Sequence, residues 1–125
     1  MCYNASLTEL KLDRNRLRQR GEIGCTVSSL AMLLEVNHSF KHLSLAHCDL
    51  GDSGLALLSH GLIQNHTLNV LNLQSNELTN EGLKAFSRSF QKGITSLSNI
   101  NLQDNHISDE GAISLAHSLR YLKDK

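Results

Sequence analysis

The stretch Leu-Asn-Val-Leu-Asn-Leu-Gln-Ser-Asn-Glu-Leu at positions 68–78 decides the fold of this chain. Leucine fills its first, fourth, sixth and last positions, and an asparagine stands two residues before its end. The same pattern occurs four times, starting at Leu7, Phe40, Leu68 and Leu97, with spacings of 33, 28 and 29 residues. A period of this length predicts repeated units that each bury their apolar residues against the next unit.

A second pattern follows each motif and predicts a helix. Glycine stands four residues beyond the last apolar position, and in the last three copies apolar residues recur at spacings of four, as Leu58 and Leu62 do. This spacing is helical, whereas the alternation inside the motif has the period of a strand. We expect helix starts at Ser53, Thr79 and Ser108, first-turn acids at Asp52, Glu81, Asp109 and Glu110, and a helix end at Lys92-Gly93.

The first copy departs from this spacing by about five extra residues around positions 18–24, before a helix predicted over 27–36. Their charged, glycine-rich composition favours a solvated loop. An exposed insertion is also a common place for a specific contact.

The motif L-x-x-L-x-L-x-x-N/C-x-L followed by glycine resembles the ribonuclease-inhibitor-like class of leucine-rich repeats over residues 7 to about 122. The resemblance implies an α/β solenoid, a short horseshoe arc with a parallel sheet on its concave side and helices on its convex side. Residues 1–125 are then one domain of four repeats of about 28 residues, with approximate bounds 7–39, 40–67, 68–96 and 97–125.

Polar residues at the ninth motif position are predicted to be structural. Asn15, Asn76 and Asn105 stand where the backbone leaves the strand, and a side-chain amide there can bond backbone groups inside the coil. Cys48 takes this place in the second copy, where burial as a weak donor is favoured over reactivity. Asn4, Asn37 and Asn65 each match the glycosylation acceptor pattern, which we attribute to the repeat itself.

Composition gives the chain no obvious charged partner. Lys and Arg total 12 against 12 Asp and Glu, so we expect neither nucleic-acid nor membrane binding. Three cysteines without C-x-x-C spacing, and the lack of a signal-like or transmembrane segment, favour a cytoplasmic protein. The seven histidines show no metal-ligand spacing, and no phosphate loop or nucleophile motif occurs. We therefore expect no enzyme activity, no metal and no cofactor.

The expected binding surface is the concave face, which the residues between the inward leucines line. Charged residues stand in the first strand, and neutral amides in the third and fourth suit hydrogen bonding to a protein better than phosphate neutralisation. Solvated strand residues that bind nothing would give the same pattern. The candidate residues are Lys11, Asp13, Arg14, His42, Ser44, His47, Asn72, Gln74, Asn101 and Gln103.

The chain ends offer a second candidate surface, because neither end repeat carries a recognisable polar cap. We expect an intracellular protein-interaction scaffold that binds a partner protein through its concave sheet or its solenoid ends, where neighbouring chains could continue the solenoid. One alternative is a structural subunit of a ciliary or cytoskeletal assembly. Another is a regulatory module of a GTPase-activating protein or an innate-immune sensor.

Overall fold

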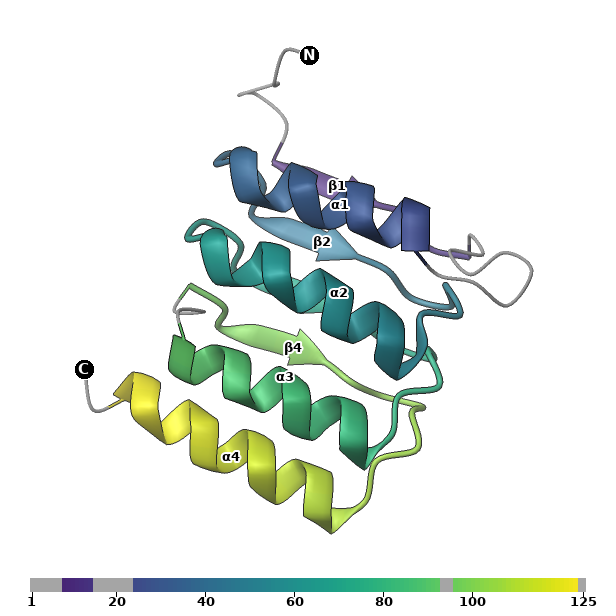
Figure 1. Ribbon diagram of the computed structural model, residues 1–125, viewed down its shortest axis with the longest axis vertical. Helices are drawn as coiled ribbons and strands as arrows, with labels where there is room; N and C mark the ends of the chain where they lie inside the picture. The colour runs from purple at the N-terminus through teal and green to yellow at the C-terminus, as the bar shows by residue number, and fades with distance from the viewer. Residues whose placement is uncertain (1–7, 15–23, 93–95, 124–125) are drawn as a thin grey trace.

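The computed structural model describes residues 8–14, 24–92 and 96–123. Within them the chain alternates strand and helix four times, and the helices cover one face of the sheet (Figure 1). The strands are β1 (Glu9–Lys11), β2 (His42–Ser44), β3 (Val70–Asn72) and β4 (Asn99–Asn101). The helices are α1 (Gly24–Val36), α2 (Gly51–Gln64), α3 (Asn80–Lys92) and α4 (Asp109–Lys123).

The four strands form one parallel sheet in chain order, which is the arrangement that a leucine-rich solenoid requires. Equivalent motif positions pair across it, so that Leu10, Leu43, Leu71 and Ile100 form one row. Each strand holds only the first inward residue of its motif. The ladder continues beyond it, because Leu45 N–H donates to the Asn72 carbonyl over 2.9 Å and Leu73 N–H to the Asn101 carbonyl over 2.8 Å.

The core lies between sheet and helices and is built almost wholly from leucine. Leu45, Leu50 and Leu58 of the second repeat and Leu73 and Phe86 of the third are fully buried. The corresponding residues of the last repeat, Leu102, Ile107 and Leu115, are only partly buried although they pack on the same cluster. These positions are therefore fully buried where a following repeat covers them and only partly buried in the last repeat.

Two predicted helix starts need correction. Helix α1 begins at Gly24, three residues before the expected Val27. Helix α2 begins at Gly51, so Ser53 lies inside its first turn and is not the N-cap that we expected; Leu50 is the N-cap and makes no side-chain capping bond. The Gly51 N–H instead donates to the Asn76 carbonyl over 2.8 Å, so the neighbouring repeat supplies an acceptor at this helix start.

The other boundaries agree with the sequence where the structure describes them. Thr79 and Ser108 directly precede α3 and α4, and α3 ends at Lys92. First-turn acids occur in α2, α3 and α4 as predicted. The predicted loop over 18–24 lies, up to residue 23, outside the described residues, as does Asn15.

Asparagine side chains join consecutive repeats at the turn out of each strand. The Asn76 carboxamide oxygen accepts from Cys48 N–H at 3.0 Å and Leu50 N–H at 3.1 Å, and its amide nitrogen donates to the Leu45 carbonyl at 2.8 Å. All three partners belong to the preceding repeat. Asn105 makes the same set of bonds to Asn76, Leu78 and Leu73, which confirms the structural role predicted for both asparagines.

Cys48 stands at the position of these asparagines in the second repeat and makes only part of their set of bonds. It is fully buried, and its Sγ lies 3.0 Å from the Leu12 carbonyl oxygen, the place that the asparagine amide nitrogen takes in later repeats. A thiol donates weakly and offers no carboxamide oxygen. Cys48 therefore supplies the donor contact of this set through its thiol, in place of a carboxamide.

We predict that Asn76→Ala lowers the free energy of unfolding by about 3 kcal/mol, because it leaves several buried backbone groups without partners. Urea denaturation followed by circular dichroism measures the change. Asn99→Ala, on the exposed first position of β4, is the matched control and should change stability by less than about 0.5 kcal/mol. An equal loss of unfolding free energy in the two variants would show that the hydrogen bonds of Asn76 do not stabilise the fold beyond an ordinary surface residue.

Candidate interaction surfaces

The structure places the predicted binding residues in rows across the sheet, on the face away from the helices, which we call the sheet face. One row follows the strand register and contains Lys11, Ser44, Asn72 and Asn101. His42 pairs with Val70 one pleat earlier. Asp13, Arg14, His47, Gln74 and Gln103 follow the strands, and this group is exposed except for the half-buried Gln74.

Several of these side chains bind within the protein. Asp13 Oδ1 accepts from the Ser44 hydroxyl at 2.6 Å and from the Ala46 N–H at 3.1 Å. Ala46, which period two places on this face, is buried. Asn72 and Asn101 each accept from the N–H two residues further on, at 3.0 Å. Their carboxamide oxygens thus each accept a bond within the protein, and none of the described residues accepts from their amide N–H groups, which can donate to a ligand.

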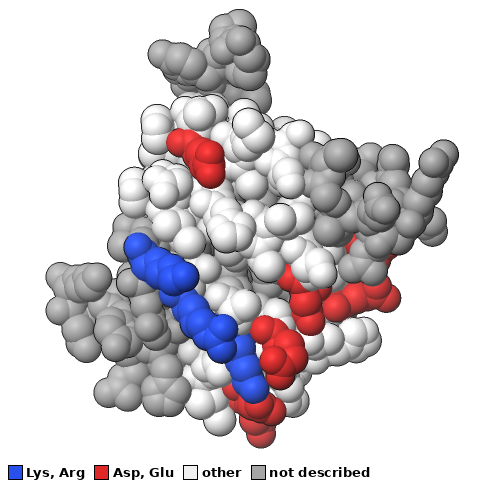
Figure 2. Space-filling view, in the orientation of Figure 1, with Lys and Arg blue, Asp and Glu red and all other residues white. Residues whose placement is uncertain are grey.

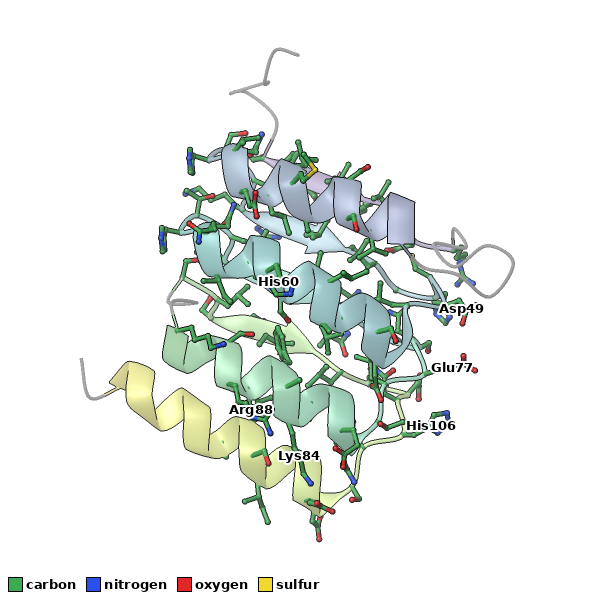
Figure 3. All side chains as sticks on the ribbon, in the orientation of Figure 1. Asp49, His60, Glu77, Lys84, Arg88 and His106 are labelled. Atoms are coloured by element: carbon green, nitrogen blue, oxygen red, sulfur yellow. The ribbon has the colours of Figure 1, made fainter. Side chains whose placement is uncertain are left out.

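The turn after each strand adopts left-handed backbone at residues other than glycine. Arg14, His47, Ser75 and Asp104 share one position of this turn, with φ between 56° and 65°. Asp49 and Glu77, two residues further along, have φ of 54° and 58°. Asp49, Glu77 and His106 lie along one edge of the molecule, where the strands lead into the helices (Figure 3).

The flank formed by β4 and α4, which we call the C-terminal flank, carries an apolar hollow of about 290 Å³. The positions equivalent to Leu102 and Ile107 are Leu73 and Leu78, which are fully buried inside the stack. Ile113 on α4 adds a side chain that is 55% exposed. The hollow is lined by Leu83, Leu102, Ile107, Ala112, Leu115 and Ala116.

A second polar ladder runs along the helix starts, and sequence reasoning missed it. The Asp52 carboxylate accepts from the N–H of Thr79 at 2.9 Å and from its hydroxyl, so it holds the residue that precedes the helix of the following repeat. Asn80 does the same for α4, accepting from the N–H groups of Ser108 and Gly111 at 3.0 Å each. The signal was present as Asp52, Asn80 and Asp109, which stand at the same place in successive motifs.

Other candidate sites receive no support from the described part of the chain. Asn37 and Asn65 are buried, and Asn65 Nδ2 donates to the carbonyls of Leu34 and Asn37 at 2.9 Å, so these acceptor patterns serve the fold; Asn4 lies outside the described residues. The described residues contain no His, Cys, Asp or Glu group that could hold a metal ion. Nor does any helix among them have the length and apolarity to cross a membrane.

A family model described as Leucine Rich repeat matches residues 36–59, 64–87 and 93–116, more than half of the chain. The chain belongs to the leucine-rich repeat family. The predicted fold class, a four-repeat α/β solenoid, is confirmed by the four strand–helix units and by this match. Assignment to the ribonuclease-inhibitor-like class stays a prediction.

Curated relatives are much longer than this leucine-rich repeat segment. Mouse NACHT, LRR and PYD domains-containing protein 14 is 35% identical over 98 residues, which cover 78% of this chain and 9% of that protein. Mouse centrosomal protein of 78 kDa is 36% identical over 65% of this chain and 10% of its own length. The chain thus spans about a tenth of these two relatives.

Solved structures share the fold. The tropomodulin C-terminal domain of Caenorhabditis elegans is similar with a TM-score of 0.66 at 19% identity, over 97% of this chain and 87% of that one. Leiomodin-1 Actin-Binding Site 2 is similar with a TM-score of 0.70 at 17% identity, over 97% and 83% of the two chains. A leucine-rich repeat fold of this kind supports a role in protein interaction.

Glycine in the first turn of α3 and of α4 has a steric reason. A Cβ added at Gly82 would overlap the Asp52 carboxylate, and one added at Gly111 would lie 2.5 Å from Asn80 Oδ1. The glycine therefore leaves room for this side chain of the preceding repeat. In these two helices, the helix-start ladder therefore depends on the glycine of the motif.

We predict a strong coupling between these two positions. Gly82→Ala should displace the Asp52 carboxylate from Thr79 and lower the free energy of unfolding by about 1–2 kcal/mol, although alanine is the better helix former. In an Asp52→Ala background the same substitution should be neutral or stabilising by up to about 1 kcal/mol. Urea titrations of the four proteins give the cycle, and additive effects would refute the steric link.

Proposed function

We propose that this chain is an intracellular protein-interaction scaffold whose C-terminal flank binds a further leucine-rich repeat of a partner protein. The observation that carries the proposal is the apolar hollow of about 290 Å³ on that flank. Inside the stack, the same positions are covered by the next repeat. The flank therefore has the shape and chemistry of a repeat-to-repeat contact on its open side.

The polar groups of the flank point to the same occupant. In the second and third repeats, two backbone N–H groups of the turn bind the asparagine of the following repeat. Asn105 and Ile107 hold these places in the fourth repeat, and none of the later described residues provides an asparagine for them. Asp109 is exposed at the position from which Asp52 and Asn80 bond the start of the next helix.

A leucine-rich repeat would both fill the apolar hollow and bind the polar groups of the flank. A generic apolar partner would only fill the hollow. The leucines of the repeat would fill the hollow, its asparagine would accept from the Asn105 and Ile107 N–H groups, and its helix start would receive Asp109. Within the described residues β4 is the last strand of the sheet, and its edge could pair with a fifth parallel strand.

The test is to fuse a second copy of residues 68–96 after Lys125, which places the copied Leu68 29 residues after Leu97 and so keeps the spacing of the third and fourth motifs. Burying the half-exposed flank should raise the free energy of unfolding by about 3 kcal/mol, measured by urea denaturation. The matched control is a copy in which Leu71, Leu73 and Leu78 are serine. No rise, or the same rise with the control, would contradict the proposal.

A structural role in a cytoskeletal assembly is a second candidate, acting through the sheet face. Similarity to the centrosomal protein and to an actin-binding site of leiomodin-1 supports it. The amide row with Asn72 and Asn101 supplies donors that suit a protein surface. A third candidate is a regulatory module of a GTPase-activating protein or an innate-immune sensor. The mouse relative whose name gives NACHT, LRR and PYD domains supports a leucine-rich repeat region that works beside other domains.

Co-sedimentation with actin filaments and with microtubules tests the second candidate. We expect the wild-type chain to pellet with one of the two polymers, and Asn72→Arg/Asn101→Arg to weaken this at least about tenfold, because two long cations would block the amide donors. Lys41→Arg, a change on an exposed residue before β2 that preserves charge, is the control. A wild-type chain that stays in the supernatant of both polymers would exclude this candidate.

A further inference from the structure

The helix face carries a row of equivalent positions whose chemistry changes along the stack. Met32, His60 and Arg88 stand 28 residues apart on α1, α2 and α3, and Val36, Gln64 and Lys92 repeat the same spacing one helical turn further on. The motif leaves these positions free, since they face neither sheet nor core. We call this set the helix-face patch: Met32, Val36, His60, Gln64, Arg88 and Lys92.

One end of the patch is apolar. Met32 is 65% exposed and Val36 is 59% exposed, and their spacing of four places them side by side on α1. Among the described residues, the other large apolar side chain with comparable exposure is Ile113, on the C-terminal flank. Neighbouring exposed apolar side chains are typical of interaction sites.

The other end is basic and lies over a hollow of about 230 Å³ between α2 and α3. Its floor is made of small or apolar residues, Ala56, Ser59, Ile63, Ala85 and Ser89, while His60, Arg88 and Lys92 stand around it. No acidic residue lines it. Figure 2 shows the Lys and Arg side chains in one line over α3, and Figure 3 shows His60 and Arg88 on the two adjacent helices.

The cations of α3 are not equivalent. Lys84 pairs with Glu81 and with Glu110, and the hydrogen bond to Glu110 is the main cause that raises the pKa of Lys84 above its ordinary value of 10.5. For Arg88 and Lys92, by contrast, the described part of the chain provides no carboxylate within 4.0 Å. Among the described residues, therefore, acidic side chains compensate the charge of Lys84 but not the charges beside the hollow.

We propose that the helix-face patch binds a short segment of a partner protein that is apolar at one end and acidic at the other. Its carboxylates lie at Arg88 and Lys92, and its apolar side chains contact Met32 and Val36. Glu35, exposed on α1, disfavours the reverse orientation because it would face the acidic end. Two helix spacings separate the ends, about 20 Å, which an extended segment of about six residues spans. This surface is distinct from the flank and the sheet face.

An acidic protein segment fits better than a nucleic acid or a membrane. Two cations, Arg88 and Lys92, neutralise too few phosphates for stable nucleic-acid binding, which uses about 6–10 contacts. An anionic membrane needs a cluster of about 4–8 cations. An apolar group and a small cationic group at opposite ends suit a short, directional peptide.

The test uses a fluorescent peptide of about eight residues, with leucines at one end and glutamates at the other, and measures binding by fluorescence anisotropy. Arg88→Glu should weaken binding at least about tenfold, and Met32→Ser at least about threefold. Lys41→Glu makes the same charge change on an exposed residue elsewhere and should leave affinity unchanged. Met32 and Arg88 are exposed, so we expect both variants to fold, and circular dichroism checks this.

The order of the peptide decides between a directional site and simple charge attraction. A peptide of the same composition with alternating leucine and glutamate should bind at least about fivefold more weakly. Equal binding of the two peptides, equal binding of an oligouridylate of the same charge, or equal loss with Lys41→Glu would each overturn the proposal. The fusion carrying a fifth repeat should bind the ordered peptide unchanged, which separates this surface from the C-terminal flank.

Discussion

The structure depends on one constraint: every backbone group that turns inward after a strand must find a hydrogen-bond partner inside the coil. The chain leaves each strand through left-handed residues such as His47 and Ser75, and this turn directs N–H groups toward the interior. Water does not reach them. The carboxamide of Asn76, fully buried, supplies both an acceptor and a donor at that point. Leucine packing fills the space around it, but the asparagine decides the geometry.

Because the partners of each asparagine belong to the preceding repeat, satisfaction of the turn is a property of pairs of repeats. The second ladder has the opposite direction, since Asp52 and Asn80 extend forward to bond the start of the next helix. The third repeat therefore both donates side chains to its neighbours and accepts theirs in the two ladders, through Asn76, Thr79 and Asn80. In the last repeat, Asn105 bonds to the preceding repeat, but no later described residue supplies an asparagine for the turn of the last repeat itself. The apolar hollow and the polar groups of the C-terminal flank have this common cause.

Sequence reasoning predicted the strands and helices because the spacing of apolar residues within a single repeat reveals both of its elements. Leu71 and Leu73 alternate as a strand does, and Leu58 and Leu62 recur as a helix face does. It was wrong at Ser53, because the first N–H of α2 is bonded by a carbonyl of the next repeat. Reading Asp52 only against the dipole of its own helix concealed its bond to Thr79. Contacts between repeats have no signature within one repeat, so they become visible only when equivalent positions are aligned.

The same logic indicates where specificity resides in such a chain. Positions that serve the core or the ladders are fixed by packing and by hydrogen bonding, as the steric demand at Gly82 illustrates. On the sheet face, Asp13 and Asn72 already use acceptor oxygens within the protein. Met32 and Arg88 stand at a position that the motif does not constrain, and one is an exposed apolar side chain and the other a cation without a carboxylate partner in the described part of the chain. Differences at such equivalent but unconstrained positions cost the fold little, and they therefore give one solenoid a surface that another with the same motif lacks.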